Sequence, residues 1–538
     1  MKYLVILFVP GDAPYAFDTS LAGGSSAAAL CVSWACRIAA EGKPALLCSS
    51  QDEAAVREAA GDAVRVVVRD EWTLAGVLDE MVHLASEGGY EGVVFSLADR
   101  PLLNTAITQE VIEHHERYVA EYTFADGYPE GLAPQVISAG TLSILASLAH
   151  GQHKEAGDEP FKAGSIWQLL QRDINSFEVE SVLAPKDFRM LRLTFSCDRK
   201  RGFLACKRLI ELAAASGGGG ELSALELSSI AERSVRVQRT VPAFFDVQIS
   251  GNCNTVAIYD PYPVEFKRLH GVLPTAQDNP TQPFMSADEF ALLMNQVEEL
   301  SGDAVVSLGS MGEPLLHPAF PSFVEAVLRH RGLRVLVETD GTLVTQELTD
   351  RVAAIVRNAG PRSGGGDAIT WIVSLDSSDE AMYDRLITGG SFGRALSAVS
   401  LLHAHFPRAV YPQFTRMKDN EGQLEAFYRY WSDASSPSGG NVIIQKYDHY
   451  CHALPDRKSA DLSPLERLPC WHIKRDMTVL SDGSVPLCRE CMARPLGNAF
   501  TDGLAALWDK GESVAADHIR GVYPKHCEVC DEYYTFNF

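Results

Sequence analysis

The cysteines of this chain are distributed so unevenly that they constrain how its C-terminal part can fold. Six of the twelve lie within residues 451–538: Cys451, Cys470, Cys488, Cys491, Cys527 and Cys530. Cys488 with Cys491 and Cys527 with Cys530 form two CxxC pairs, and hydrophobic periodicity fades over the same segment. Two sulfurs separated by two residues can reach one metal without strain. The segment is therefore predicted to fold around a metal centre.

A short hairpin is expected between Cys470 and Cys488. The sequence there contains MTVLSDGSVPL, with two short apolar runs on either side of Asp482-Gly483. Asp-Gly favours a tight turn with positive φ. Such a hairpin would return Cys488 toward Cys470, and the LGNAFTDGLAALW that follows predicts a loop and a short helix ending at Trp508.

This order of features resembles the SPASM domain, and in particular its one-cluster form, the twitch domain. The resemblance implies one auxiliary 4Fe-4S cluster with Cys470, Cys488, Cys527 and Cys530 as ligands and Cys491 as an alternate. No cysteine follows Cys530, so a single cluster is expected. A structural zinc ion on the two CxxC pairs is the alternative, because four thiolates also satisfy zinc. We favour the cluster because only the cluster accounts for Cys470 and the hairpin.

The rest of the chain shows the alternation of an α/β protein. At 538 residues the chain is too long to fold around a single hydrophobic core. Short apolar runs alternate with helical patterns, which is typical of helices covering mostly parallel sheets. The run from Ser216 to Gly220 has the composition of a linker. We therefore expect an N-terminal α/β sandwich (1–215), a linker (216–242), a partial (β/α) barrel (243–450) and a small C-terminal cluster domain (451–538).

Three short motifs lie in the expected middle domain. They are MGEP at residues 311–314, TDG at 339–341 and SLD at 374–376. They resemble the GGEP motif, the TNG-like strand end and the methionine- and ribose-contacting strand of the radical S-adenosylmethionine (radical SAM) core. The resemblance implies that any bound SAM would contact Gly312, Glu313, Pro314, Ser374 and Asp376. A second role is open to Glu313, which can instead cap a helix or brace neighbouring loops.

The cysteines that bind the cluster of a radical SAM core are incomplete here. The family carries CxxxCxxC after its first strand, and the corresponding stretch begins at Cys253 but has Ala257 and Asp260 at the next two positions. Three thiolates must hold three irons and leave the fourth iron open to SAM. Alanine cannot ligate iron, and aspartate is a hard, poor ligand for such a cluster. Ordinary reductive cleavage of SAM is therefore expected to be absent.

The stretches SLADRPLLN, from Ser96 to Asn104, and DGYPEGLAPQVIS mark the N-terminal domain. They resemble the cytidylyltransferases that activate acidic sugars, which have a GT-A type fold. The resemblance implies that Asp99 would hold a divalent metal, and a turn or helix-cap role is the alternative. The loop after the first strand, VPGDAPYAFDTSLAGGSS, contains no Lys or Arg to neutralise a triphosphate. Nucleotidyl transfer is expected to be lost.

Net charge and hydrophobicity limit the classes of partner that this protein can bind. A net charge of -23 opposes binding to nucleic acid and to anionic membranes. Pro10 and Asp12 interrupt the apolar opening before it reaches signal-peptide length, and no run could span a bilayer, so a cytoplasmic location is expected.

We interpret the chain as an iron-sulfur protein of radical SAM/SPASM ancestry, a pseudoenzyme whose core has become a binding or scaffold module. One alternative is an active peptide- or metabolite-modifying enzyme, for which a peptide or protein substrate and an electron donor would be the partners. The other is a zinc-stabilised interaction protein.

Overall fold

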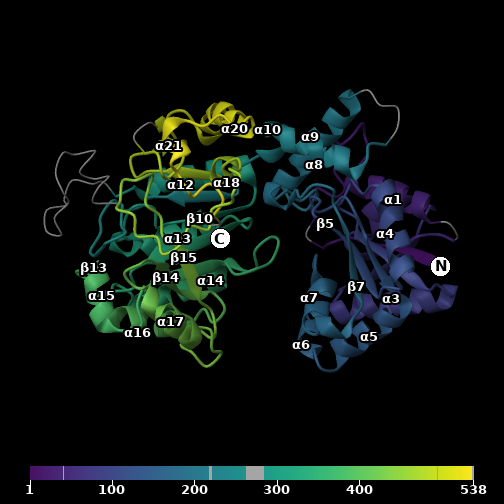
Figure 1. Ribbon diagram of the computed structural model, residues 1–538, viewed down its shortest axis with the longest axis horizontal. Helices are drawn as coiled ribbons and strands as arrows, with labels where there is room; N and C mark the ends of the chain where they lie inside the picture. The colour runs from purple at the N-terminus through teal and green to yellow at the C-terminus, as the bar shows by residue number, and fades with distance from the viewer. Residues whose placement is uncertain (12, 40–41, 217–220, 262–283, 493–494, 536–538) are drawn as a thin grey trace. The chain divides into compact units, whose positions relative to one another are not determined.

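The computed structural model describes residues 1–11, 13–39, 42–216, 221–261, 284–492 and 495–535 (Figure 1). The chain divides into two units, Met1–Thr240 and Val241–Phe538. Asp12 and most of the expected glycine linker, Gly217–Gly220, lie outside the described residues. The first unit extends beyond that linker and includes the residues up to Thr240.

The sheet of the first unit has the strand order β3-β2-β1-β4-β6-β5-β7. Its strands are β1 (Tyr3–Phe8), β2 (Ala45–Ser49), β3 (Arg65–Arg69), β4 (Gly92–Leu97), β5 (Tyr122–Asp126), β6 (Gln135–Ser138) and β7 (Val179–Leu183). All neighbouring pairs are parallel except those of β6, which is antiparallel to β4 and β5. Val5 and Leu7 of β1 pack into one core, and Leu4 and Ile6 pack into another on the opposite face. Because helices cover both faces, β1 is apolar throughout.

Helices cover both faces of this sheet. They are α1 (Ala27–Ile38), α2 (Glu53–Ala60), α3 (Leu74–Gly88), α4 (Thr105–Tyr118), α5 (Ala139–His150), α6 (Lys154–Gly157), α7 (Ser165–Gln171), α8 (Lys200–Ala215), α9 (Ala224–Arg233) and α10 (Val235–Gln238). Helices α1, α4 and α8 pack on one face, and α3, α5 and α7 on the other. The segment expected to be a linker differs from that expectation, because α9 starts with a capping box of Ser223 and Glu226 and packs with α10 against α8.

The sheet of the second unit is parallel throughout, with the order β15-β14-β12-β11-β10-β8-β16. Its strands are β8 (Phe244–Val247), β10 (Ala304–Ser307), β11 (Leu333–Thr339), β12 (Ile369–Ser374), β14 (Val410–Arg416), β15 (Ile443–Lys446) and β16 (Asp476–Val479). The helices around it are α12 (Ala287–Ser301), α13 (Phe320–Leu328), α14 (Gln346–Ala359), α15 (Glu380–Leu386), α16 (Phe392–His403) and α17 (Leu424–Trp431). Strand and helix alternate as in a partial (β/α) barrel, which confirms the expected α/β class.

The C-terminal segment builds on the edge of this barrel. It contains α18 (Trp471–Arg475), β16, β17 (Ser484–Pro486), β18 (Pro495–Asn498), α19 (Leu504–Lys510), α20 (Glu512–Ile519) and α21 (Lys525–Glu528). The Asp-Gly turn forms, with Gly483 at φ 82°. The strand before the turn, β16, pairs with β8 of the barrel, whereas β17 pairs with β18. The cysteine-rich segment and the barrel therefore share one sheet.

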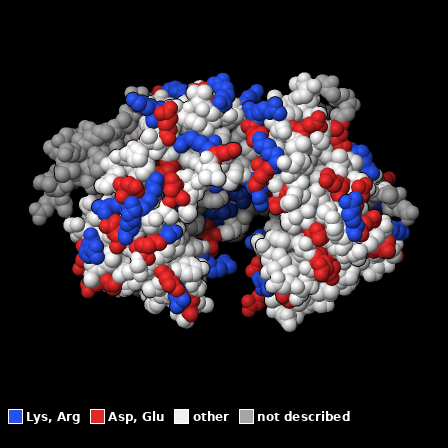
Figure 2. Space-filling view, viewed as in Figure 1, with Lys and Arg blue, Asp and Glu red and all other residues white. Residues whose placement is uncertain are grey.

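The surface shows mixed charge. Acidic and basic side chains are interspersed over the face of both units that is drawn in Figure 2. In the part of the chain that the structure describes, no helix is both long and apolar enough to cross a membrane.

Candidate metal centre and barrel cavity

Five cysteines line one cavity in the C-terminal part of the second unit. They are Cys451, Cys470, Cys488, Cys527 and Cys530, and the empty volume of the cavity is about 410 Å³, including the solvent at its mouth. Cys470 is the N-cap of α18, Cys488 follows β17 and Cys527 lies in α21. Cys470 and Cys527 are only 8% and 5% exposed. The fold thus brings together the four cysteines expected as ligands, from segments up to 60 residues apart in the chain.

The chemistry of this donor set fits a thiolate-bound metal. Burial raises the pKa of Cys470 and that of Cys527 to about 12, and it raises the pKa of Cys488 well above its usual range. Such thiols stay protonated at neutral pH unless a metal takes the place of their protons. Five thiols around one cavity suit an iron-sulfur cluster or zinc.

Cys451 is the cysteine that sequence reasoning missed. It lines the cavity, whereas Cys491 does not. Cys530 lines the same cavity, and its proximity together with burial raises the pKa of the Cys451 thiol. Its backbone is left-handed at φ 50°, between Tyr450 at 47° and His452 at 67°. This conformation costs roughly 1–2 kcal/mol per residue outside glycine, so the surrounding contacts must hold the turn in place. Cys451 belongs to no CxxC pair, and only its place in the cysteine-rich segment pointed to it.

Arg467 holds the last CxxC pair in position. Its Nη1 donates to the carbonyl of Cys530 at 3.1 Å, and its Nη2 donates to the carbonyl of Cys527. The guanidinium carbon lies 4.7 Å from the ring centroid of Tyr523 and 4.4 Å from that of Tyr533. Arg467 also lines the cavity, so a fixed positive charge lies beside the thiols. This charge would favour an anionic cluster.

His518, carried by α20, offers a second group to the cavity that it lines. Its Nδ1 accepts a hydrogen bond from the backbone N–H of Cys470 at 3.3 Å. Burial lowers its pKa to about 4, so the ring is neutral at pH 7 and carries its proton on Nε2. His518 is 2% exposed, and its Nε2 has no hydrogen-bond partner among the described residues. A sulfur in the cavity could accept this proton in a hydrogen bond.

A larger cavity opens at the carboxyl ends of the barrel strands. Its empty volume is about 1460 Å³, including the solvent at its mouth. Side chains two residues apart on a strand point to the same face of the sheet. On the inner face of this barrel, an apolar residue is followed two positions later by a polar one. The apolar residues Phe244, Leu336 and Ile372 are followed by Asp246, Glu338 and Ser374. Burial raises the pKa of Asp246 and that of Glu338. The lining of the barrel cavity is therefore apolar at the level of Phe244, Leu336 and Ile372 and polar toward the carboxyl ends of the strands.

Glu313 braces the loop that contains it. Its Oε1 accepts hydrogen bonds from Thr339 Oγ1 at 2.9 Å and from the N–H of Leu315 at 3.0 Å. Its Oε2 accepts from the N–H of Asp340 at 3.0 Å. Burial, reinforced by the Asp340 charge, raises the pKa of Glu313 to about 8. Both oxygens are thus engaged within the protein, as the bracing role requires.

The MGEP loop is locked by close backbone contacts. Met311 has φ 47°, and a Cβ on Gly312 would lie 1.9 Å from the carbonyl oxygen of Ser250. Gln248 donates to the carbonyl of Met311 at 2.9 Å and accepts from the N–H of Ser481 at 3.2 Å. The loop is therefore tied both to β8 and to the Asp-Gly turn of the cysteine-rich segment.

The incomplete cysteine motif lies at the cavity. Cys253, Ala257 and Asp260 all line it, together with Glu313. Burial and the charges of Asp260 and Glu313 raise the pKa of Cys253. One thiol is thus found where three would be needed.

Contacts within the protein hold the loop that carries this motif. Asn254 Nδ2 and Thr255 Oγ1 donate to Asp340 Oδ2 at 2.8 and 2.9 Å. The two-residue strand β9 (Val256–Ala257) pairs with β13 (Ile387–Thr388). The loop thus has protein partners on both sides.

Ser374 and Asp376 have different surroundings. Ser374 lines the cavity. Asp376 is fully buried at φ 58°, and its Oδ2 accepts a hydrogen bond from the hydroxyl of Tyr259. Its Oδ1 accepts from the N–H of Thr415 at 2.6 Å, and burial raises its pKa to about 6. Asp376 is thus engaged within the protein, and Pro314 likewise is buried as the first residue of a 3₁₀ turn.

Arg489 connects the two cavities because it lines both of them. It follows Cys488 directly in the chain, and its Nε lies 3.1 Å from Glu490 Oε1. Its Nη2 lies 3.8 Å from Asp448 Oδ2. The Arg489 charge also counteracts the effect of burial on the pKa of Asp246. A fixed cation therefore links the thiol cavity to the acidic interior of the barrel.

In the first unit, a serine hydroxyl connects Asp99 to a second carboxylate. Asp99 is 1% exposed, and burial raises its pKa. The hydroxyl of Ser196 lies 2.7 Å from Asp99 Oδ2 and 2.9 Å from Asp198 Oδ1. Sequence reasoning did not single out Asp198, because nothing local relates residues from two distant stretches. Two carboxylates are few ligands for a divalent metal, which prefers six or more oxygens.

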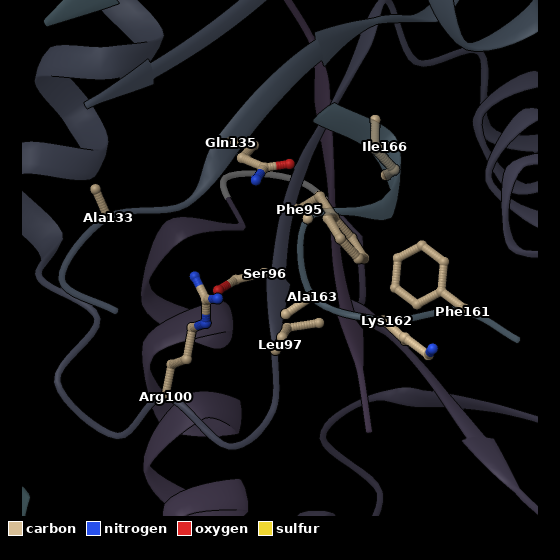
Figure 3. A pocket seen from close by; sticks show the side chains of 11 residues that line it. Phe95, Ser96, Leu97, Arg100, Ala133, Gln135, Phe161, Lys162, Ala163 and Ile166 are labelled. Carbon is tan, nitrogen blue, oxygen red and sulfur yellow. The ribbon is translucent and has the colours of Figure 1, made fainter. Parts of the chain in front are cut away.

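Figure 3 shows a cavity of the first unit beside β4, with an empty volume of about 330 Å³. The Arg100 side chain extends toward Ser96, and the rings of Phe95 and Phe161 meet edge to face with their centroids 5.9 Å apart. Three buried polar atoms, Ser96 Oγ, Arg100 Nε and Gln135 Oε1, have no hydrogen-bond partner among the described residues. Asp99 does not line this cavity. The cavity and the Asp99 carboxylate are thus separate features.

Comparison with known proteins finds family matches for both the barrel and the cysteine-rich segment of the second unit. The family model of the radical SAM superfamily matches residues 266–430, and the SPASM model, an iron-sulfur cluster-binding domain, matches residues 470–531. An uncharacterized protein of Treponema pallidum (strain Nichols) is 37% identical over 386 residues, which cover 70% of this chain and 100% of that protein.

Two solved structures are distant likenesses. SuiB of Streptococcus suis, bound to the precursor peptide SuiA, is 13% identical over 64% of this chain and 86% of that chain, with a TM-score of 0.41. A cytidylyltransferase from Leptospira borgpetersenii is 12% identical over 43% of this chain and 94% of that chain, with a TM-score of 0.35. The sequence matches carry the assignment: the chain belongs to the radical SAM superfamily, in one family with the Treponema protein, and is an iron-sulfur protein with a C-terminal SPASM domain.

Proposed function

We propose that this protein binds one auxiliary 4Fe-4S cluster through Cys470, Cys488, Cys527 and Cys530, and that its barrel binds a ligand without cleaving SAM. The observation that carries the proposal is the contrast between two places in one unit. Five thiols line the C-terminal cavity, whereas Cys253 is the single cysteine that lines the barrel cavity.

The surroundings of the thiols favour a cluster over zinc. Zinc needs four thiolates and no more. The cavity holds five, and it is also lined by Arg467 and by His518 with its unpartnered Nε2. Hydrogen bonds and charges around the sulfurs are how proteins tune iron-sulfur clusters. A cluster therefore makes use of more of the cavity than zinc would.

Three features support the loss of SAM cleavage. Hydrogen bonds and the β9–β13 pairing hold the loop of Cys253. Both oxygens of Glu313 accept hydrogen bonds from the protein. Asp376 is bonded to Tyr259 and Thr415. SAM would have to displace these partners and would find no cluster with an open iron beside it.

The test is metal analysis of the protein after anaerobic reconstitution. About four irons and four sulfides per chain are expected, with the matching absorption spectrum. Cys470→Ala should lose them, and Cys491→Ala, outside the cavity, should keep them. About eight irons would mean a second cluster at Cys253 and would favour the enzyme. Stoichiometric zinc without sulfide would favour the zinc-stabilised interaction protein.

The loss of SAM cleavage has its own test. Reduced, reconstituted protein incubated with SAM should form no more 5'-deoxyadenosine than a control reaction without the protein. Calorimetric titration with SAM should show no heat at millimolar concentration. Formation of 5'-deoxyadenosine would overturn this part of the proposal while leaving the auxiliary cluster intact.

We extend the proposal to the first unit and to the partners. Nucleotidyl transfer is absent, because residues 9–26 contain no Lys or Arg to hold a triphosphate, and Ser196 connects Asp99 to one further carboxylate, that of Asp198. Calorimetry with CTP and Mg²⁺ should therefore show no binding. The barrel ligand is a peptide or protein segment, an electron donor serves the cluster, nucleic acid and membrane are not partners, and the protein acts in the cytoplasm.

A further inference from the structure

We propose that the cavity beside β4 in the first unit binds a small organic carboxylate that has an apolar body and one further hydrogen-bond donor. Its empty volume is about 330 Å³, including the solvent at its mouth. Neither Asp99 nor any described residue among 9–26 lines it. It is therefore separate from the metal and triphosphate site that the sequence resemblance implies, and it does not depend on the cluster of the second unit.

The cavity forms where two strands of the sheet part. The pairing of β4 with β6 ends at Phe95 opposite Gln135, whereas β4 continues to Leu97. Pro134 precedes Gln135, and a proline has no N–H with which to continue the ladder. On this side, Ser96 and Leu97 thus have no partner among the described strands, and both line the cavity. The carboxyl ends of strands in such sheets are a common place for ligands.

Polar atoms without partners line this cavity. Ser96 is 4% exposed and Arg100 is 9% exposed, and neither Ser96 Oγ nor Arg100 Nε has a hydrogen-bond partner among the described residues. The same holds for Gln135 Oε1. Buried polar groups are nearly always hydrogen-bonded in native proteins. The hydroxyl and the guanidinium N–H can donate, and the amide oxygen accepts. A ligand that satisfies all three presents two acceptors and one donor.

The charges of the lining specify the sign of the ligand. Arg100 and Lys162 line the cavity, and none of the described residues that line it is an Asp or a Glu. Glu130 Oε1 lies 2.5 Å from Arg100 Nη2, which leaves Nε for the ligand. Lys162 is exposed and adds a second positive charge. In a chain with a net charge of -23, this lining favours an anion, and a carboxylate supplies the two acceptors.

Aromatic rings complete the cavity. Figure 3 shows Arg100, Ser96 and Gln135 on one side and the rings of Phe95 and Phe161 on the other. Ligand sites typically combine an apolar lining with a few polar groups that fix orientation. The carboxylate of the ligand thus pairs with Arg100 and Ser96, its donor pairs with Gln135, and its apolar body contacts the two rings.

Calorimetric titration of the full-length chain tests the proposal with N-acetyl-L-leucine as the probe. Three matched compounds each lack one feature. N-acetyl-L-leucinamide has no carboxylate, 4-methylpentanoate has no N–H, and inorganic phosphate has no apolar body. N-acetyl-L-leucine should bind, and each of the three should bind about tenfold more weakly or not at all.

Variants of the lining locate the binding site. Arg100→Gln and Ser96→Ala should each weaken binding of N-acetyl-L-leucine about tenfold. Gln135→Met should remove the preference for N-acetyl-L-leucine over 4-methylpentanoate, which a change in folding alone would not do. Arg65→Gln is the control, because Arg65 is exposed, pairs with Glu87 and does not line the cavity. Far-UV circular dichroism of each variant verifies that it folds.

The possible results separate the proposal from its alternatives. Absence of heat with N-acetyl-L-leucine at millimolar concentration overturns it, and water then suffices for the three polar atoms. Equal binding of N-acetyl-L-leucinamide overturns the assignment of a carboxylate, and equal binding of phosphate overturns the assignment of an apolar body. Wild-type affinity in both Arg100→Gln and Ser96→Ala would put the probe elsewhere on the protein and would also overturn the proposal.

Discussion

Replacing Glu313 by glutamine distinguishes two roles of its carboxyl group, bracing the loop and binding a ligand. Glu313 is 6% exposed, and its pKa is raised from 4.5 to about 8, first by burial and then by the charge of Asp340. Between these two values the folded chain holds a proton that the unfolded chain releases. Its stability must therefore fall as pH rises through this window, and the loss is complete above pH 8.

The size of the effect follows from the shift. The two pKa values differ by about 3.5 units, and one unit corresponds to about 1.4 kcal/mol. The full contribution is therefore about 5 kcal/mol, of which about 3.5 kcal/mol falls between pH 5 and pH 8. Glutamine carries no charge at any pH and has no such slope. It leaves the N–H of Asp340 without an acceptor, which costs about 1–2 kcal/mol at every pH. The two stability curves should cross.

Chemical unfolding of the metal-free chains at a series of pH values measures both curves. Glu313→Gln should be less stable than the wild type at pH 5 and more stable at pH 8. Glu325→Gln, on the exposed side of α13, is the matched control and should follow the wild type. Parallel curves for Glu313→Gln and the wild type would refute the reasoning, because they would mean that the three hydrogen bonds keep Glu313 ionised in the folded chain.

Three further predictions follow from the same region and from the thiol cavity. Gly312→Ala should cost about 3 kcal/mol or more, because its Cβ would lie 1.9 Å from a backbone oxygen. Gly393→Ala in α16, with open space around it, should gain about 0.5–1 kcal/mol, and thermal unfolding that ranks the two the other way contradicts this. Tyr259→Phe removes a hydrogen bond from buried Asp376 and should cost about 1–3 kcal/mol in urea unfolding, and an unchanged midpoint would count against it. His518→Ala removes a donor to the reduced cluster and should lower the reduced fraction at a fixed potential about tenfold, or about 59 mV for one electron, and an unshifted redox titration would disprove the role.

The parts of this molecule that sequence alone predicted are those fixed by local pattern. The alternation of short apolar runs with helical patterns predicted a mostly parallel sheet covered by helices, and the residues of β1 do pack into two cores, one on each face of such a sheet. Asp482-Gly483 predicted a turn with positive φ, and Gly483 at φ 82° confirms it. In both cases the residues that decide the structure are neighbours in the chain, so the signal can be found without knowing the fold.

The missed features depend on residues that are far apart in sequence. The pairing of β16 with β8 joins segments that start at Asp476 and Phe244, and nothing in either strand specifies the other. Cys451 reaches the thiol cavity through a turn whose left-handed backbone contains no glycine. Asp198 meets Asp99 only once the sheet of the first unit has formed. Tertiary packing decides each of these, and no local pattern records it.

The two cysteine sites of the second unit differ in what surrounds their thiols. Around Cys253 the loop is held by Asp340, by Tyr259 bonded to Asp376 and by the pairing of β9 with β13. Around the C-terminal thiols Arg467 donates to two carbonyls, and His518 accepts a hydrogen bond from the N–H of Cys470. The backbone there is thus fixed by protein contacts, and five thiols line one cavity. Burial raises the pKa of Cys470 and that of Cys527 to about 12, so a bound metal centre would replace protons that these thiols otherwise keep at neutral pH.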